Sequence, residues 1–200
     1  MASDQVATLL RVSHFAALAH QHQRRKSPSS PAYIQHPLDV ARRISNVPSS
    51  LAGSLNDNHV TDILCAAMCH DILEDTEVSE LELRKQVGDA VTEIVLECTD
   101  DKSLSKLERK QAQIDHASTL SDSAKHVKLA DKLSNLNDLI SIEGRPAGWS
   151  VSRIQEYFEW SKRVTDQCKH VNPGLGQQLD DLYERGTFVY QDGETYKCIP

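Results

Sequence analysis

The sequence predicts one all-α domain, a bundle of about eight to ten helices over residues 1–186, followed by a tail at residues 187–200. Apolar residues recur at helical spacing along most of the chain. Two segments carry the Ser-x-x-Glu pattern that is typical of a helix start. No convincing run of alternating apolar and polar residues precedes the tail. Two hundred residues are enough for one sizeable hydrophobic core.

The first half of the chain is expected to form five helices separated by polar breaks. Their expected ranges are residues 6–20, 37–45, 59–73, 79–88 and 89–97. Pro37 suits the first position of its helix, because that position leaves the amide hydrogen unpaired anyway. Ser79 and Glu82 form a capping-box pattern, and Gly88 ends the short helix that follows.

The second half is expected to form four more helices, separated by Gly-Arg-Pro and Asn-Pro-Gly sequences. Their expected ranges are residues 105–117, 122–139, 150–169 and 175–185. Ser105 and Glu108 repeat the capping-box pattern. Asp122 or Ser123 would cap the long helix that follows.

The tail has a different character from the rest of the chain. Asp192-Gly193 lies between β-forming residues, which is a hairpin signal. A lone hairpin is only marginally stable in water, so docking on the helical body and disorder both remain open.

Composition limits the classes of function. A net charge of −7 argues against a nucleic-acid binder, which would carry a basic surplus, but allows a small phosphorylated nucleotide as substrate. The sequence has neither an 18-residue apolar run nor a secretory signal, so no membrane span is expected. Five scattered cysteines suit a reducing cytoplasm. Cys65 and Cys69 could ligate zinc, but buried thiols are the favoured interpretation because no second pair completes a site. The oligomeric state is not predicted.

The most informative motif is His70-Asp71, followed at once by Glu74 and Asp75. On a continuous helix, residues four apart share a face, so His70 would lie beside Glu74 and Asp71 beside Asp75. Carboxylates crowded together without a cation are costly to bury. The motif therefore predicts a metal.

Other segments offer donors of the same kind. His36 precedes the proline that begins the second helix, and Asp131 lies within an apolar helix. Together with His70 and Asp71 they make a nitrogen and oxygen donor set suited to manganese or iron. Such a set leaves room for water and a phosphate oxygen, and a metal lowers the pKa of bound water.

Each of these residues also has a simpler interpretation. His36 could serve only at the helix entry, and Asp131 could pair with Lys128 or Lys132. Glu74 and Asp75 could form a solvated helix end, although acids are disfavoured at a helix C-terminus. The joint occurrence of the set favours the metal site, because independent coincidences would otherwise be needed.

These motifs resemble those of the HD-domain phosphohydrolases, and within them the hydrolase domain of SpoT/RelA-type alarmone enzymes. The chain is most similar to stand-alone metazoan members over about residues 5 to 185. The matching stretches are residues 19–26, 31–37, 66–76, 99–102, 106–110, 127–135 and 153–160. The resemblance implies removal of the 3′-pyrophosphate from guanosine 3′,5′-bis(diphosphate) (ppGpp), giving GDP and pyrophosphate, with one Mn²⁺.

The resemblance also implies roles for individual residues. It assigns the metal to His36, His70, Asp71 and Asp131, and water activation to Glu74 and Asp75. It assigns the substrate to Arg24, Arg25, Lys26, Lys106, Asn135, Arg153 and Tyr157, with Lys102 as a further positive charge. Arginine suits this task because its planar guanidinium binds phosphate in a bidentate manner and stacks on purines. Trp160 is expected in the core.

The sequence departs from the family pattern at two places. Met68-Cys69 replaces the usual aliphatic pair before His70, and Ser134 stands where an aromatic residue or histidine is common. Two alternatives to ppGpp hydrolysis remain. The same site could remove the 2′-phosphate of NADPH, or the domain could be a silent binding module, which the complete set of ligands argues against.

Overall fold

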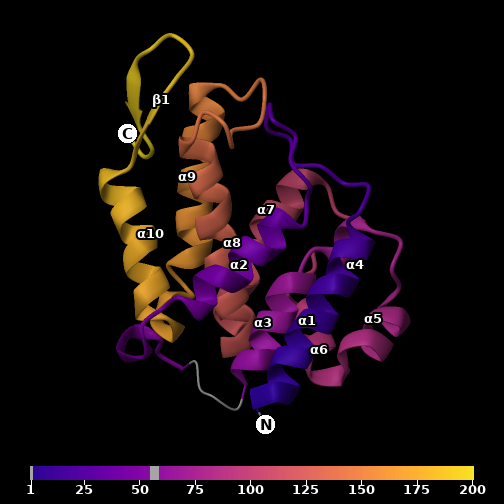
Figure 1. Ribbon diagram of the computed structural model, residues 1–200. Helices are drawn as coiled ribbons and strands as arrows, with labels where there is room; N and C mark the ends of the chain where they lie inside the picture. The colour runs from indigo at the N-terminus through magenta and orange to yellow at the C-terminus, as the bar shows by residue number, and fades with distance from the viewer. Residues whose placement is uncertain (1, 55–58) are drawn as a thin grey trace.

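The computed structural model describes residues 2–54 and 59–200 as a helical bundle with a small hairpin at its C-terminal end (Figure 1). The α-helices are α1 (Ala2–Ala19), α2 (Gln35–Ser45), α3 (Val60–Cys69), α4 (Ile72–Asp75), α5 (Glu80–Val87), α6 (Asp89–Cys98), α7 (Lys106–His116), α8 (Asp122–Ile140), α9 (Val151–Thr165) and α10 (Pro173–Arg185). Short 3-10 segments are η1 (Ser49–Leu51), η2 (Ala117–Thr119) and η3 (Lys169–Val171), and the strands are β1 (Thr187–Val189) and β2 (Thr195–Lys197). The predicted all-α class is confirmed.

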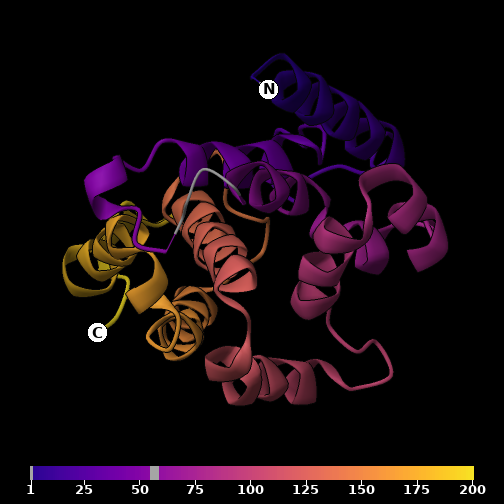
Figure 2. The same cartoon turned by 90° about the horizontal axis from the view of Figure 1, so that it is seen from below.

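Helix α8 is the centre of the molecule. It packs against α2, α3, α6, α9 and α10, and Figures 1 and 2 show it between the α2–α3 side and the α9–α10 side. Its buried residues include Lys128, Asp131 and Lys132 as well as apolar ones. Charged groups inside a bundle must find partners there, because burial without them is costly. The middle of α8 is therefore where a functional site is built.

The predicted helix over residues 59–73 is wrong at its end. Helix α3 stops at Cys69 and α4 begins at Ile72, so His70 and Asp71 lie at a break between two helices. The Asp71 backbone has φ −97° and ψ −3°, and its carbonyl accepts the amide of Asp75 at 2.9 Å. The break lets the side chains of His70 and Asp71 turn into the bundle rather than follow the helix face.

Two helices begin at the serine caps that the sequence predicts, and a third has its cap earlier than expected. Ser105 and Glu108 form a complete capping box, and Ser79 accepts the amide of Glu82 at 3.2 Å. Ser121 caps α8, where Asp122 or Ser123 was expected, because its hydroxyl accepts the Ala124 amide.

The last two helices also differ from the expected ranges. Helix α9 ends at Thr165 rather than residue 169, and α10 already begins at Pro173.

The tail forms the predicted hairpin and is docked on the bundle. Phe188 pairs with Tyr196 at the centre of the two strands, and Gly193 supplies the positive φ of 83° that the turn needs. Phe188 and Cys198 are buried against the body. Packing on the helices stabilises a hairpin that would be only marginally stable in isolation.

Two expectations from composition can also be compared with the structure. Cys65 and Cys69 are free thiols buried within α3, as the simpler interpretation held. Within residues 2–54 and 59–200, no helix is both long and apolar enough to cross a bilayer.

Candidate active site

The four predicted metal-binding side chains converge in the middle of the molecule. His36 comes from the first turn of α2, His70 and Asp71 from the break between α3 and α4, and Asp131 from the middle of α8. Nε2 of His36 lies 3.2 Å from Asp131 Oδ1 and 3.8 Å from Asp71 Oδ2. Nε2 of His70 lies 3.2 Å from Asp71 Oδ2 and 3.7 Å from Asp131 Oδ1. Three distant segments of chain thus direct donor atoms at one point.

The arrangement of His70 fits a divalent cation. Its Nδ1 lies 2.8 Å from the carbonyl of Ala67, so Nδ1 carries the hydrogen and Nε2 presents a lone pair to the centre. Within the described ranges, this buried Nε2 has no hydrogen-bond partner. A lone pair 3.2 Å from the Asp71 oxygen is repulsive unless a proton or a metal cation lies between them. The donors His36, His70 and Asp71, all within 4.8 Å of one another, therefore suit a metal.

His36 is oriented by a relay that the sequence did not reveal. Its Nδ1 lies 3.1 Å from Ser134 Oγ, and Ser134 donates to Asp39 Oδ2 at 2.8 Å. Because the Ser134 hydroxyl gives its hydrogen to Asp39, it accepts one from His36. Arg43 Nε in turn donates to the same Asp39 oxygen at 2.6 Å. The departure at Ser134 thus supplies a hydrogen-bond partner that turns Nε2 of His36 toward the centre.

We expect Ser134→Ala to weaken metal binding by about 10- to 100-fold, the usual effect of removing a partner behind a histidine ligand. The measurement is Mn²⁺ titration by calorimetry. Ser161→Ala is the matched control, because Ser161 is equally buried and its hydroxyl has no partner among the described residues. Equal Mn²⁺ affinity in the two variants would contradict the relay.

The two carboxylates are also held by partners. Tyr33 donates its hydroxyl to Asp71 Oδ2 at 2.7 Å. Lys132 donates to Asp131 Oδ2 at 3.0 Å, and Asn135 donates to Asp131 Oδ1 at 2.6 Å. Burial pushes the pKa of Asp131 upward, but the charge of Lys132 is the largest influence that holds it well below its usual value. Both oxygens of Asp131 are thereby kept charged and fixed in position.

The two acids after the break have different surroundings. Glu74 is largely buried, and its Oε1 accepts the amide of Asp100 at 2.8 Å. Burial is the main cause that raises the pKa of Glu74 to about 7, with the nearby charges of Asp100 and Asp71 adding to it. Asp75 instead lines a cavity and lies 3.6 Å from Lys102 Nζ. A carboxyl whose pKa is near neutrality can exchange protons at physiological pH.

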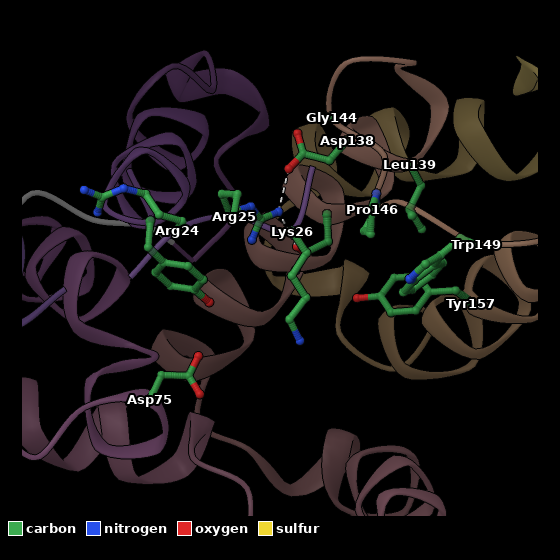
Figure 3. A pocket seen from close by; sticks show the side chains of 12 residues that line it. Arg24, Arg25, Lys26, Asp75, Asp138, Leu139, Gly144, Pro146, Trp149 and Tyr157 are labelled. Atoms are coloured by element: carbon green, nitrogen blue, oxygen red, sulfur yellow. Dashed lines mark hydrogen bonds and ion pairs between the residues drawn. The ribbon is translucent and has the colours of Figure 1, made fainter. Parts of the chain in front are cut away.

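A cavity of about 230 Å³ (Figure 3) lies beside this cluster, because Tyr33 and Asn135 line it and bond to Asp71 and Asp131. Its lining residues are Arg24, Arg25, Lys26, Tyr33, Asp75, Asn135, Asp138, Leu139, Gly144, Pro146, Trp149 and Tyr157. Arg25 donates to Asp138 and to Asn135 Oδ1. In Figure 3 the Lys26 side chain extends toward Asp75 and Tyr157, whereas the Arg24 guanidinium points away from them. The cavity thus combines cations with aromatic rings, as a nucleotide site requires.

The structure brings some of the predicted substrate residues together and leaves others outside. Lys106 is exposed in the first turn of α7 and does not line the cavity. Arg153 is also outside the lining, with its guanidinium 4.2 Å from the ring centre of Trp149. Asn135 lines the cavity, but its amide nitrogen is bound to Asp131. Trp160 packs against the core, half-buried, with Lys132 4.6 Å from its ring centre.

Sequence reasoning missed Tyr33, Asp39 and Trp149. It named Lys132 only as an ion-pair partner of Asp131, and Ser134 only as a departure from the family pattern. Tyr33, Lys132 and Ser134 bond to the cluster, Trp149 lines the cavity, and Asp39 bonds to Ser134 behind the cluster. For Ser134 and Lys132 a signal existed, because both lie within one helical turn of Asp131. Asp39 likewise follows His36 by three residues on one helix. Trp149 lies in a loop, where spacing gives no signal.

Comparisons with known proteins agree with this geometry. A family model described as HD domain matches residues 13–149. The chain is 44% identical over 181 residues to the guanosine-3′,5′-bis(diphosphate) 3′-pyrophosphohydrolase MESH1 of Xenopus tropicalis, covering 90% of this chain and 96% of that protein. The human protein of the same name is 42% identical over 184 residues, covering 91% and 96%.

One solved structure is similar to this chain in both fold and sequence. It is that of a metazoan orthologue of SpoT described as hydrolysing ppGpp and playing a role in starvation responses. It superposes with a TM-score of 0.80 at 38% identity, and the match covers 90% of this chain and 95% of that one. The chain therefore belongs to the HD domain family, in the group that contains the animal MESH1 proteins.

Proposed function

We propose that this protein is a Mn²⁺-dependent ppGpp 3′-pyrophosphohydrolase, which converts ppGpp and water to GDP and pyrophosphate. The observation that carries the proposal is the convergence of two imidazoles and two carboxylates beside a cavity lined by basic and aromatic side chains. The names of the animal relatives support the same substrate.

The four converging side chains, His36, His70, Asp71 and Asp131, are those that would hold the ion. Nitrogen and oxygen donors in equal number favour Mn²⁺ over Mg²⁺, which prefers oxygen ligands alone. When bound, the ion supplies Lewis-acid polarisation of the phosphoryl group and makes nearby water more acidic. The hydrogen bonds from His70 to Ala67 and from His36 to Ser134 keep both imidazoles in the tautomer that can bind it.

Glu74 acts as general base in this proposal. Its carboxylate accepts a proton from water while the water oxygen bonds to the 3′-phosphorus. The bond between that phosphorus and the ribose 3′ oxygen breaks, the 3′ oxygen takes a proton from solvent, and Glu74 returns its proton to solvent. A pKa of about 7 suits a base at neutral pH. The bond from the Asp100 amide fixes the carboxylate in position. Asp75, which faces the cavity beside Lys102, assists by ordering the water and the cation.

The cavity supplies substrate binding. Lys26 is placed to neutralise phosphate charge, because its ammonium group has no ion pair or hydrogen bond among the described residues and extends into the cavity. Trp149 and Tyr157 lie edge to face, with ring centres 5.6 Å apart, and offer an aromatic surface for a purine. Arg25 is held by Asp138 beside Tyr33, so it presents a fixed positive charge at the cavity wall.

The test is hydrolysis by the purified protein with Mn²⁺ and, in parallel, Mg²⁺, over ppGpp, GTP and NADPH, with products separated by anion exchange. We expect GDP and pyrophosphate from ppGpp with Mn²⁺, and a higher KM for Lys26→Ala. Arg24→Ala is the matched control, because Arg24 points away from the cavity centre and should change KM less. Faster release of phosphate from NADPH than of pyrophosphate from ppGpp would assign the site to the alternative substrate instead.

A further inference from the structure

One wall of the cavity is an irregular loop, residues 141–150, between α8 and α9. It contributes Gly144, Pro146 and Trp149 to the lining. The loop also contacts the basic segment opposite, because the Ala147 amide donates to the Lys26 carbonyl at 3.3 Å. A loop with few backbone bonds of its own is mobile unless other elements hold it. The question is therefore what keeps this wall in place.

The C-terminal hairpin binds this loop through Arg145. That side chain is buried, and its NH1 donates to the Val189 carbonyl of β1 at 3.0 Å. Its guanidinium lies 5.0 Å from the ring centre of Phe188 and 5.8 Å from that of Tyr190. Arg145 Nε also donates to the Leu139 carbonyl at the end of α8, at 2.8 Å. One side chain thus connects the loop, the central helix and the hairpin.

A second contact ends at the cavity itself. The Tyr190 hydroxyl donates to the carbonyl of Trp149 at 3.0 Å. The Trp149 ring is the one that faces Tyr157 in the cavity, and Arg153 stacks on it from α9. The hairpin is also fixed to α9, because Gln155 donates to the Lys197 carbonyl at 3.0 Å. The tail therefore holds the aromatic part of the cavity wall from behind.

We propose that the hairpin formed by β1 and β2 positions the loop 141–150 for nucleotide binding, with Arg145 and Tyr190 as the positioning residues. The match to the HD domain model ends at residue 149, before the hairpin and the two helices that precede it. The inference rests on the proposed function only for what the cavity binds. Loosening the loop should weaken substrate binding and leave the chemistry at the metal cluster unchanged.

The chain offers a matched pair of variants for the test. Tyr190→Phe removes only the hydroxyl that reaches Trp149. Tyr196→Phe removes a hydroxyl from the same hairpin, but among the described residues that hydroxyl bonds only to Asp192 within the hairpin turn. Arg145→Ala is the stronger variant, and Tyr190→Phe serves where Arg145→Ala fails to fold. The measurements are hydrogen exchange of residues 141–150 without nucleotide, and kcat and KM with ppGpp.

We expect faster exchange at residues 141–150 in Tyr190→Phe and a KM raised about three- to tenfold, as one neutral hydrogen bond predicts. kcat and Mn²⁺ affinity should not change, and Tyr196→Phe should match the parent throughout. Unchanged exchange in Tyr190→Phe would overturn the inference, as would faster exchange with an unchanged KM. If the parent does not hydrolyse ppGpp, the proposed function fails, while the exchange measurement still decides whether the hairpin holds the loop.

Discussion

Replacing Asp131 by asparagine is expected to remove Mn²⁺ binding and hydrolysis together. Asp131 is the only one of the four donors that comes from α8, and its Oδ1 faces both imidazoles. An amide oxygen lacks the negative charge that offsets a divalent cation in a buried site. The loss of Mn²⁺ affinity should exceed the roughly 100-fold upper range for a residue behind a ligand. Calorimetric titration with Mn²⁺, together with ppGpp hydrolysis, measures both effects.

The same substitution should also lower stability. Lys132 is buried, and its ammonium group pairs with Asp131 at 3.0 Å. Removing one partner of a buried pair leaves the other charge uncompensated, at a cost of up to about 3–5 kcal/mol. Contact with the Trp160 ring at 4.6 Å offsets part of that loss. Thermal unfolding without metal therefore separates this effect from the loss of Mn²⁺.

Asp122→Asn is the control for Asp131→Asn. Asp122 is on the same helix but exposed in its first turn. It should keep Mn²⁺ affinity, hydrolysis and the melting temperature close to those of the parent. Undiminished Mn²⁺ binding in Asp131→Asn would remove Asp131 from the ligand set. No Mn²⁺ binding by the parent would instead make the cluster a buried ion-pair network.

The donor set could be predicted from the sequence because its members lie in short motifs. His70-Asp71 is contiguous, and His36 and Asp131 occur in words whose residue types already suggest chemistry. The partners behind these donors could not be predicted in the same way. Ser134 and His36 are 98 positions apart, and only the packing of α2 on α8 makes them neighbours. Spacing places Ser134 near Asp131 and Asp39 near His36, but it does not show that Ser134 meets His36 and Asp39 across the two helices.

The fold shows the same division between local and long-range information. Helix starts at Ser79 and Ser105 depend on neighbours three residues away, so sequence is sufficient. The break at His70 depends on what the side chain meets inside the bundle, and apolar periodicity does not report it. The inclusion of Lys106 among the substrate residues shows the same limit, because the direction of its side chain depends on how α7 packs on α9.

Glu74→Gln should reduce kcat/KM by about 10²–10⁴-fold, the usual contribution of a general base, while Mn²⁺ binding is retained. The glutamine oxygen can still accept the Asp100 amide, so position is kept and only proton transfer is lost. Asp75→Asn is the paired variant, since Asp75 lines the cavity and should have the smaller effect on kcat. A larger loss in Asp75→Asn would make Asp75 the principal base.

The pH dependence provides the independent evidence. Burial raises the pKa of Glu74 to about 7, so the base is protonated and inactive below that pH. The parent's kcat/KM should therefore rise with pH up to about 7 and then level off, and Glu74→Gln should lose this rise.

The stability of the parent should change with pH in the opposite direction to its activity. A folded-state pKa above the unfolded value means that the parent loses stability as pH rises from about 4.5 through 7. Glu74→Gln should lack that loss and melt higher than the parent at pH 8, so a slower but more stable variant is the combined result that identifies Glu74 as a base held in an unfavourable environment.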